Sequence, residues 1–278
     1  MGDFLDVVGD WTEIKLRIVQ EYSKAYAMIL HKHRQLKFSY IDAFAGAGSV
    51  ILKDTRAEKA GSSISVLNIE PKFDYYHFID INHARAERLR QLTAERNDVF
   101  VYEGDCNKIL IEEIFPRCRF EDYCRALCLF DPYELNPSWE IVETAGKMRS
   151  IELFMNFMIM DANRNILWAN PNAVRPEQIG RMNAFWGDES WKEAAYESRR
   201  GLFGDMIEKK TNDAIIHAYG KRLKEKASFR YVPDPIPMKN KKGVPIYYLF
   251  FASHNEAGNR IAKSIFKKYK TKGLGYGS

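Results

Sequence analysis

The segment Asp131-Pro132-Tyr133 carries three groups that are suited to binding an amine. The Asp131 carboxylate and the Pro132 carbonyl oxygen can accept the two hydrogens of an amino group, favour a more tetrahedral nitrogen and stabilise the positive charge that develops on it. Tyr133 can stack on a base that is extruded or unpaired. Transfer of a methyl group to such a nitrogen requires that the nitrogen lone pair is placed against the methyl group. The alternative is a Pro-containing turn with Asp at its first position.

Three earlier segments end in residues that suit a nucleoside-containing cofactor. Gly46 and Gly48 permit a tight turn and a close approach of a ligand to the backbone, and Phe44 can shape an apolar wall. Asp80 can accept hydrogen bonds from ribose hydroxyls, and Asp105 can accept one from an adenine amino group. For the glycines the alternative is an ordinary turn, and for the two acids it is a helix N-cap. The predicted cofactor-binding residues are Asp42, Phe44, Gly46, Gly48, Asp80 and Asp105.

Apolar segments that alternate with helical patterns must position these residues. After a predicted helix from Thr12 to about Lys32, the predicted strands are Phe38–Phe44, Tyr75–Asp80, Val99–Glu103, Ala126–Phe130 and Ile151–Met158. Their continuous apolar character is typical of parallel strands buried on both faces, and the alternation indicates βαβ units. We therefore predict a doubly wound, Rossmann-like α/β fold. Ligands of such a sheet bind beyond the carboxyl ends of the strands, where the candidate residues stand.

The C-terminal part of the chain has a different pattern. Between residues 161 and 226 helical patterns occur without a convincing strand. Phe229–Val232 and Val244–Ala252 are predicted strands, and the connection Pro233–Gly243 is too short for a crossover helix, so the pair should be antiparallel. We expect one domain, with an N-terminal part at 1–160, a helical insertion at 161–228 and a hairpin and helix at 229–278 that complete the same fold.

The charge is distributed unevenly along the chain. Residues 1–160 hold 20 Lys and Arg against 25 Asp and Glu, whereas residues 161–278 hold 22 against 12. This asymmetry favours a polyanionic partner for the C-terminal part, with a solvated helical surface as the alternative. The candidate phosphate-binding residues are Arg199, Arg200, Lys209, Lys210, Lys239, Lys241 and Lys242.

The remaining composition indicates a cytoplasmic protein. The acidic start Met1–Asp6 does not resemble a signal peptide, and the apolar runs are too short to span a membrane. Cys106, Cys118, Cys124 and Cys128 are too few for a disulfide framework, and their spacing matches no common metal-ligand pattern. We therefore predict no metal site and read the cysteines as small hydrophobic residues.

Several segments together resemble the three-Cys-motif partner (TcmP) family, over most of the chain. They are Trp11-Thr12, Lys15-Leu16, Tyr40 to Gly48, Gly61-Ser62, Phe78-Ile79-Asp80, Gly104-Asp105, Phe130 to Tyr133 and Tyr247 to Ser253. That family is distantly similar to S-adenosylmethionine-dependent methyltransferases, and its name refers to a separate protein with three cysteines, of the radical type. The resemblance implies a class I methyltransferase sheet with an antiparallel terminal hairpin, S-adenosylmethionine as cofactor and a possible three-Cys-motif partner.

Two local features bear on what this resemblance implies. Ser49 to Ala60 reads as a charged loop before a helix near Ser62, whereas a nicotinamide enzyme should open a helix directly after a third glycine. Asp131-Pro132-Tyr133 is similar to the Asp-Pro-Pro-Tyr signature of base-amino methyltransferases, but lacks one of its two prolines.

Three functions are compatible with these features. The leading hypothesis is a methyltransferase that acts on an exocyclic amino nitrogen of a DNA or RNA base. The second is a methyltransferase-like binding or scaffold protein that serves the three-Cys-motif partner without turnover of its own. The third is methylation of a protein or a small molecule, for which the insertion would line an uncharged substrate pocket.

Overall fold

The computed structural model describes residues 5–201 and 204–271. Residues 1–4, part of the segment in which no signal peptide was predicted, lie outside the described residues. The largest sheet in this part of the chain has seven strands, which are β2 (Lys37–Asp42), β5 (Tyr75–Asp80), β6 (Val99–Glu103), β7 (Cys124–Phe130), β8 (Ile151–Phe157), β11 (Ile236–Lys239) and β12 (Pro245–Ala252).

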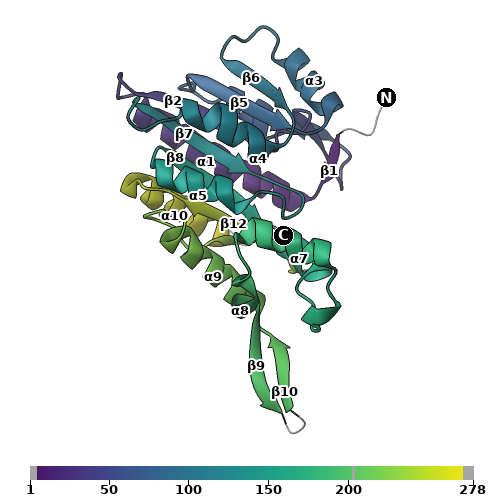
Figure 1. Cartoon of the computed structure of the whole chain (residues 1–278). Coiled ribbons are helices and arrows are strands. Elements are labelled where there is room, and N and C mark those ends of the chain that lie inside the picture. The colour runs from purple at the N-terminus through teal and green to yellow at the C-terminus, as the bar shows by residue number, and fades with distance from the viewer. Residues whose placement is uncertain (1–4, 202–203, 272–278) are drawn as a thin grey trace.

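This sheet is Rossmann-like and mostly parallel (Figure 1), with the strand order β11-β12-β8-β7-β2-β5-β6. Strand β2 pairs in parallel with β5 on one side and with β7 on the other. Strand β12 runs antiparallel to both β8 and β11. The chain therefore moves outward from β2 through β5 to β6, and then crosses to β7 on the other side of β2. The predicted α/β class is confirmed, and the C-terminal pair is antiparallel as predicted, although its first strand is β11.

Helices cover both faces of the sheet because its central strands are apolar on both sides. Phe250 and Phe251 are neighbours on β12 and so point to opposite faces. Tyr22 of α1 (Asp10–Leu30) lies against Phe251, with ring centroids 4.7 Å apart. Tyr219 of α9 (Asn212–Glu225) lies against Phe250, with centroids 5.5 Å apart. The core is therefore two apolar layers, one on each side of the sheet.

The predicted helix that precedes the first strand is confirmed as α1, although it begins at Asp10 with Gly9 as its N-cap. The other helices are α2 (Ser62–Leu67), α3 (His83–Leu92), α4 (Cys106–Ile109), α5 (Trp139–Met148), α6 (Ile159–Asn165), α7 (Pro176–Trp186), α8 (Trp191–Ala195) and α10 (Glu256–Thr271). A π-helical turn (Leu110–Ile114) and 3₁₀ turns (Phe115–Arg117 and Pro171–Ala173) complete the set. Among the described residues, no helix combines the length and apolar character needed to cross a bilayer.

The prediction that residues 161–226 contain no strand is wrong. Two strands, β9 (Tyr196–Gly201) and β10 (Gly204–Lys209), form an antiparallel hairpin that projects from the body of the protein (Figure 1). The sequences of the two strands lack the alternation of apolar and polar residues by which a half-buried strand is recognised. The rest of this segment is helical, in α6 to α9.

The first strand of the C-terminal hairpin was also placed wrongly. It is Ile236–Lys239, inside the predicted connection, whereas Tyr231 of the predicted strand forms only an isolated bridge with Ser253. Pro237 is unfavourable inside a sheet, because proline cannot donate to a sheet hydrogen bond. Strand β11 lies at the edge of the sheet, with β12 as its one neighbour, and an edge position tolerates proline.

A second, small sheet replaces the charged loop predicted at Ser49 to Ala60. Strand β3 (Ser49–Leu52) pairs in parallel with β1 (Asp6–Val8) and antiparallel with β4 (Glu58–Ala60). The helix expected near Ser62 is present as α2. Because β1 leads directly into α1, the small sheet joins the N-terminal segment to the turn that follows β2.

Candidate active site

A cavity of about 270 Å³ lies at the carboxyl ends of β2, β7 and β8. The turn after β2, the Asp131-Pro132-Tyr133 segment, the first turns of α1 and the small sheet form its walls. It stands between β2 and β7, where the strand order reverses direction. The carboxyl edge at such a switch point is where open α/β sheets bind ligands. Phe44, Gly46, Gly48, Asp131, Pro132 and Tyr133, all predicted from the sequence, line this one cavity.

Gly46 and Gly48 shape the turn after β2, and both have positive φ angles, of 64° and 88°. A Cβ added to Gly48 would lie 2.9 Å from Ile64 Cγ1, so this glycine serves the packing of the turn against α2. A Cβ added to Gly46 would have Asp6 Oδ2 at 3.8 Å as its near neighbour. Gly46 therefore leaves open space where a ligand can approach the backbone.

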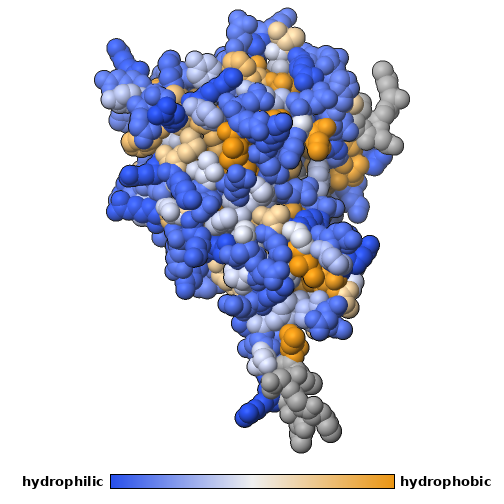
Figure 2. Space-filling view, viewed as in Figure 1, coloured by the Kyte–Doolittle hydropathy of each residue, from blue (hydrophilic) through white to orange (hydrophobic). Residues whose placement is uncertain are grey.

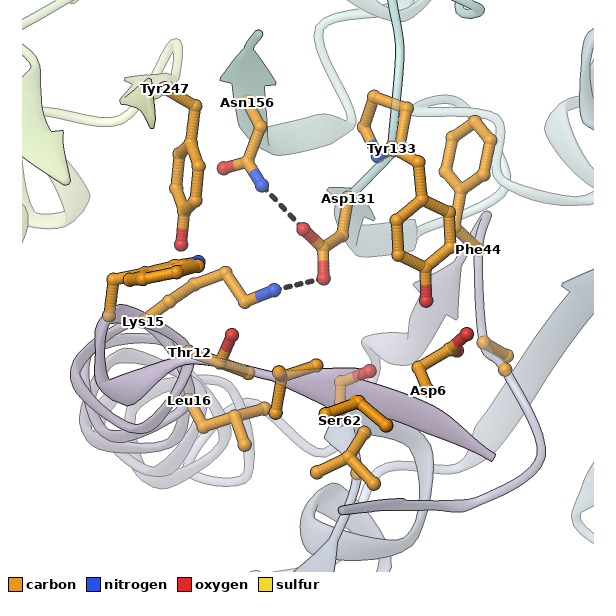
Figure 3. A pocket seen from close by; sticks show the side chains of 18 of the residues that line it. Asp6, Thr12, Lys15, Leu16, Phe44, Ser62, Asp131, Tyr133, Asn156 and Tyr247 are labelled. Atoms are coloured by element: carbon orange, nitrogen blue, oxygen red, sulfur yellow. Dashed lines mark hydrogen bonds and ion pairs between the residues drawn. The ribbon is translucent and has the colours of Figure 1, made fainter. Parts of the chain in front are cut away.

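Asp131 is held from two sides (Figure 3). Lys15 of α1 donates to Oδ2 in an ion pair, and Asn156 of β8 donates from Nδ2 to Oδ1. Lys15 is 5% exposed and Asn156 is 1% exposed. Burial raises the pKa of the Asp131 carboxyl, and Lys15 partly offsets this. The carboxylate is thus fixed in orientation at the wall of the cavity.

Asn156 also offers an acceptor to the cavity. Its Oδ1 atom is buried and has no hydrogen-bond partner among the described residues. The amide is oriented by the bond from Nδ2 to Asp131, so Oδ1 is available to a ligand that donates a hydrogen bond. A buried acceptor without a partner costs roughly 1–3 kcal/mol, which such a ligand would relieve.

Tyr133 and Phe44 supply aromatic surface (Figure 3). Tyr133 is 57% exposed, although it lines the cavity, and the guanidinium of Arg85 lies 5.9 Å from its ring centroid. Phe44 is half-buried, and Pro132, which precedes Tyr133, is buried. The exposed ring of Tyr133 is therefore accessible both from the cavity and from outside.

The three acidic residues predicted to bind the cofactor, Asp42, Asp80 and Asp105, do not line the cavity. Asp42 is fully buried behind it and accepts from Ser62 Oγ at 2.5 Å and from the Phe44 amide at 3.2 Å. Burial raises its pKa to about 7. Asp105 is exposed and caps α4, accepting from the Asn107 amide at 3.0 Å.

Asp80 fixes the backbone of the glycine turn. Its Oδ2 accepts from the Gly46 amide at 3.0 Å and its Oδ1 from the Asn82 amide at 2.8 Å. Burial raises the pKa of Asp80, although the two hydrogen bonds partly offset this effect. Asn82 itself caps α3. Asp80 thus positions Gly46 from behind.

Most of the basic residues proposed as phosphate ligands have partners of their own. Arg199 pairs with Glu197 and Glu208, and Lys209 donates to Asn163 Oδ1 at 2.8 Å. Lys210 donates to the carbonyl oxygen of Glu193 at 2.7 Å. Lys241, in the turn between β11 and β12, pairs with Asp54 in the turn between β3 and β4 at 2.6 Å.

The sequence interpretation assigned no role to Lys15, Asn156 or Asp6. Lys15 belongs to the segments that carry the family resemblance, which was the one available signal for it. The described part of the chain contains no cluster of three or more His, Cys, Asp or Glu side chains suited to a metal ion. Cys106, Cys118 and Cys128 are buried, and Cys124 is half-buried.

Solved structures to which this chain is similar include methyltransferases. A protein of Legionella pneumophila, LPL1258, is 10% identical, with 93% of each chain covered and a TM-score of 0.47. An S-adenosylmethionine-dependent methyltransferase of Clostridium acetobutylicum is 10% identical, over 84% of this chain and 91% of the other, with a TM-score of 0.39. M. jannaschii TYW2, in complex with AdoMet, is 8% identical, over 83% and 74%, with a TM-score of 0.31.

A likeness at these scores does not assign a function to this chain. No protein-family model matches this chain, and a search of curated proteins finds no match. The resemblance to the three-Cys-motif partner family therefore stays a prediction.

Proposed function

We propose that this protein is an S-adenosylmethionine-dependent methyltransferase whose acceptor is an exocyclic amino nitrogen of a nucleic-acid base. The observation that carries the proposal is the meeting of the glycine turn with Asp131-Pro132-Tyr133 in one cavity at the switch point of the sheet. The first element suits the nucleoside of the cofactor, and the second suits the amine that receives the methyl group.

The residues of the cavity fit S-adenosylmethionine. The sulfonium is a cation, and the carboxylate of Asp6 lines the cavity. The open space at Gly46 allows a ligand to approach the backbone, which Asp80 holds in place. When bound, the cofactor supplies an electrophilic methyl group, and the protein's task is to orient the acceptor nitrogen in line with it.

Three acceptors are available to the amine. Asn156 Oδ1 has no partner among the described residues, and Pro132 contributes a carbonyl oxygen. Each oxygen of Asp131 already accepts one hydrogen bond, but a carboxylate oxygen has a second lone pair. Accepting both amine hydrogens directs the nitrogen lone pair away from these oxygens and stabilises the charge that develops during transfer.

Tyr133 and the charge of the chain favour a nucleic-acid substrate. The exposed Tyr133 ring offers a surface on which a flipped or unpaired base can stack. The basic excess of residues 161–278 favours a polyanion, and Lys241 lies beside the small sheet that borders the cavity. The face in Figure 2 is mostly hydrophilic, with small separate apolar patches.

Methyl transfer can be measured directly. The protein is incubated with S-adenosylmethionine labelled in its methyl group and with single- and double-stranded DNA and RNA. We expect label in at least one nucleic acid, and Asp131→Asn to lower kcat by about 10²-fold or more while the Kd for the cofactor changes less than threefold. Cofactor binding without labelling of any nucleic acid would contradict the proposed substrate class.

A scaffold function is the second candidate, because Lys15 and Asn156 already occupy the Asp131 carboxylate and two backbone amides occupy Asp80. In that case the protein would serve a three-Cys-motif partner without turnover of its own. Calorimetry with S-adenosylmethionine and S-adenosylhomocysteine separates the two candidates. Saturable binding of both ligands supports the enzyme, and binding of neither supports the scaffold.

A further inference from the structure

A second cavity, of about 440 Å³, lies at the opposite edge of the sheet. It is lined by Arg125 at the start of β7, by Ser150 and Glu152 at the start of β8, and by the C-terminal end of α1. The first cavity is built from residues at the ends of these same strands, such as Asp131 and Asn156. Since β7 and β8 are parallel, the two cavities lie on opposite rims, and the proposed methyl transfer makes no use of the second.

Two guanidinium groups meet in this cavity at one aromatic ring. The Cζ atom of Arg125 lies 3.7 Å from the ring centroid of Phe120, and that of Arg149 lies 6.0 Å from it. Neither arginine forms an ion pair with a described residue, and Arg125 donates only to the carbonyl oxygens of Phe120 and Cys124. Arg149 has a φ of 61°, which is unusual for a residue with a side chain. The nearby carboxylate of Glu121 attracts Arg125 without forming an ion-pair contact. Two like charges that are held together and lack a contacting carboxylate among the described residues favour the binding of an anion.

Two buried hydroxyl groups in the lining are also without partners. Tyr26 is 7% exposed and Ser150 is 2% exposed, and neither Tyr26 Oη nor Ser150 Oγ has a hydrogen-bond partner in the described part of the chain. Buried polar groups are nearly always hydrogen-bonded, so unpartnered ones in a cavity wall indicate a missing ligand or water. Both hydroxyls can donate to an anionic oxygen.

Glu152 is the one carboxyl group among the described residues that line this cavity. It does not exclude an anion, because both of its oxygens are engaged by donors, Tyr22 Oη at Oε2 and Ser253 Oγ at Oε1. Burial raises the pKa of Glu152 to about 7, so its negative charge is reduced near neutral pH.

The lining also includes the apolar side chains of Ile29, Leu30 and Leu36 and the ring of Phe120. We propose that this cavity binds a small organic anion, a carboxylate or phosphate monoester attached to an apolar body, with Arg125 and Arg149 holding the anionic group and Ser150 and Tyr26 donating to it. The apolar side chains of the lining take the body of the ligand. This proposal does not depend on the proposed methyl transfer.

The test uses phenyl phosphate and benzoate as probes and benzylamine as a cation of similar shape, titrated into the full-length protein by calorimetry. We expect saturable binding of at least one anion and none of benzylamine. Tighter binding of phenyl phosphate assigns phosphate esters to the site, and tighter binding of benzoate assigns carboxylic acids. Either result supports the proposal.

Variants locate the binding. Arg149→Gln, at an exposed side chain, should weaken the anion at least about tenfold, as expected for the loss of a charged hydrogen bond. Ser150→Ala removes a hydroxyl that has no partner among the described residues, so it should keep the fold and still weaken binding. Arg56→Gln is the matched control, because Arg56 is also exposed and has a φ of 56°, but lies in the turn between β3 and β4. The proposal is overturned if the wild type binds neither anion at millimolar concentration, or if Arg149→Gln and Ser150→Ala bind them as the wild type does.

Discussion

The ammonium group of Lys15 forms an ion pair with the carboxylate of Asp131, a residue 116 positions further along the chain. Lys15 is in α1, which covers one face of the sheet, and Asp131 follows β7 at its carboxyl edge. Their ion pair joins the N-terminal helix to the residue that we propose accepts hydrogen bonds from the substrate amine. The side chains are 6% and 21% exposed, so solvent screens the pair only weakly.

Lys15→Met should destabilise the protein by about 1–3 kcal/mol at pH 8, because it leaves a partly buried carboxylate without its cation. The loss should be smaller at pH 5. Burial already raises the pKa of Asp131, and without Lys15 this pKa would rise further. A carboxyl group with a raised folded pKa makes the folded protein less stable as pH increases. Urea unfolding at the two pH values measures the difference.

The double variant Lys15→Met, Asp131→Asn is the control for this prediction, because it removes the charge that the single variant leaves unpaired. Most of the lost stability should return at pH 8. Additive effects of the two substitutions would mean that the ion pair contributes nothing and that Lys15 acts only through packing.

Gly48→Ala and Gly46→Ala should separate packing from ligand binding. Both positions have positive φ, which costs an alanine about 1 kcal/mol. At Gly48 the new Cβ would also lie 2.9 Å from Ile64 and 3.0 Å from Leu92, so we expect a total loss of about 2–4 kcal/mol. At Gly46 the space is open, so the stability loss should stay near 1 kcal/mol while cofactor affinity falls. Thermal unfolding measures the loss of stability, and calorimetry measures the affinity for the cofactor. Equal destabilisation by both variants would show that Gly48 does not pack as described.

Those parts of the site that follow an apolar strand could be predicted from the sequence. The apolar runs ending at Asp42 and Phe130 mark β2 and β7, and the parallel topology brings their carboxyl ends to one edge. Asp105 shows the limit of this reasoning, since a carboxylate just after a strand can equally cap the next helix, and Asp105 caps α4. Local sequence does not distinguish these two uses.

Lys15 and Asn156 could not be assigned from the sequence, because their contacts depend on how α1 packs against the sheet. Lys15 follows the helical pattern of α1, and Asn156 stands within an apolar strand, where a polar residue has no local signal of its partner. The β9–β10 hairpin and the edge strand β11 were missed for a related reason. The hairpin projects from the body and lacks the apolar alternation of a half-buried strand. Strand β11 has that alternation, but over only four residues and with Pro237 among them.

Glu152 should make the stability of the protein depend on pH. It is 8% exposed, and burial raises its folded pKa to about 7 from an ordinary value of 4.5. Between these two values the folded state binds more protons than the unfolded state, so stability must fall as pH rises. The ionisation of Glu152 alone should cost about 2 kcal/mol between pH 5 and pH 8.

Glu152→Gln removes this titration while it keeps an oxygen that can accept from Tyr22 or Ser253. Urea unfolding of the wild type and the variant at pH 5, 6, 7 and 8 compares their slopes. Because burial also raises the pKa of Asp42 to about 7, the variant should retain part of the dependence, so the informative quantity is the difference between the two curves. That difference should grow in favour of the variant as pH rises. Parallel curves would show that Glu152 is already ionised in the folded protein at pH 5, with Tyr22 and Ser253 stabilising its charge more than burial opposes it.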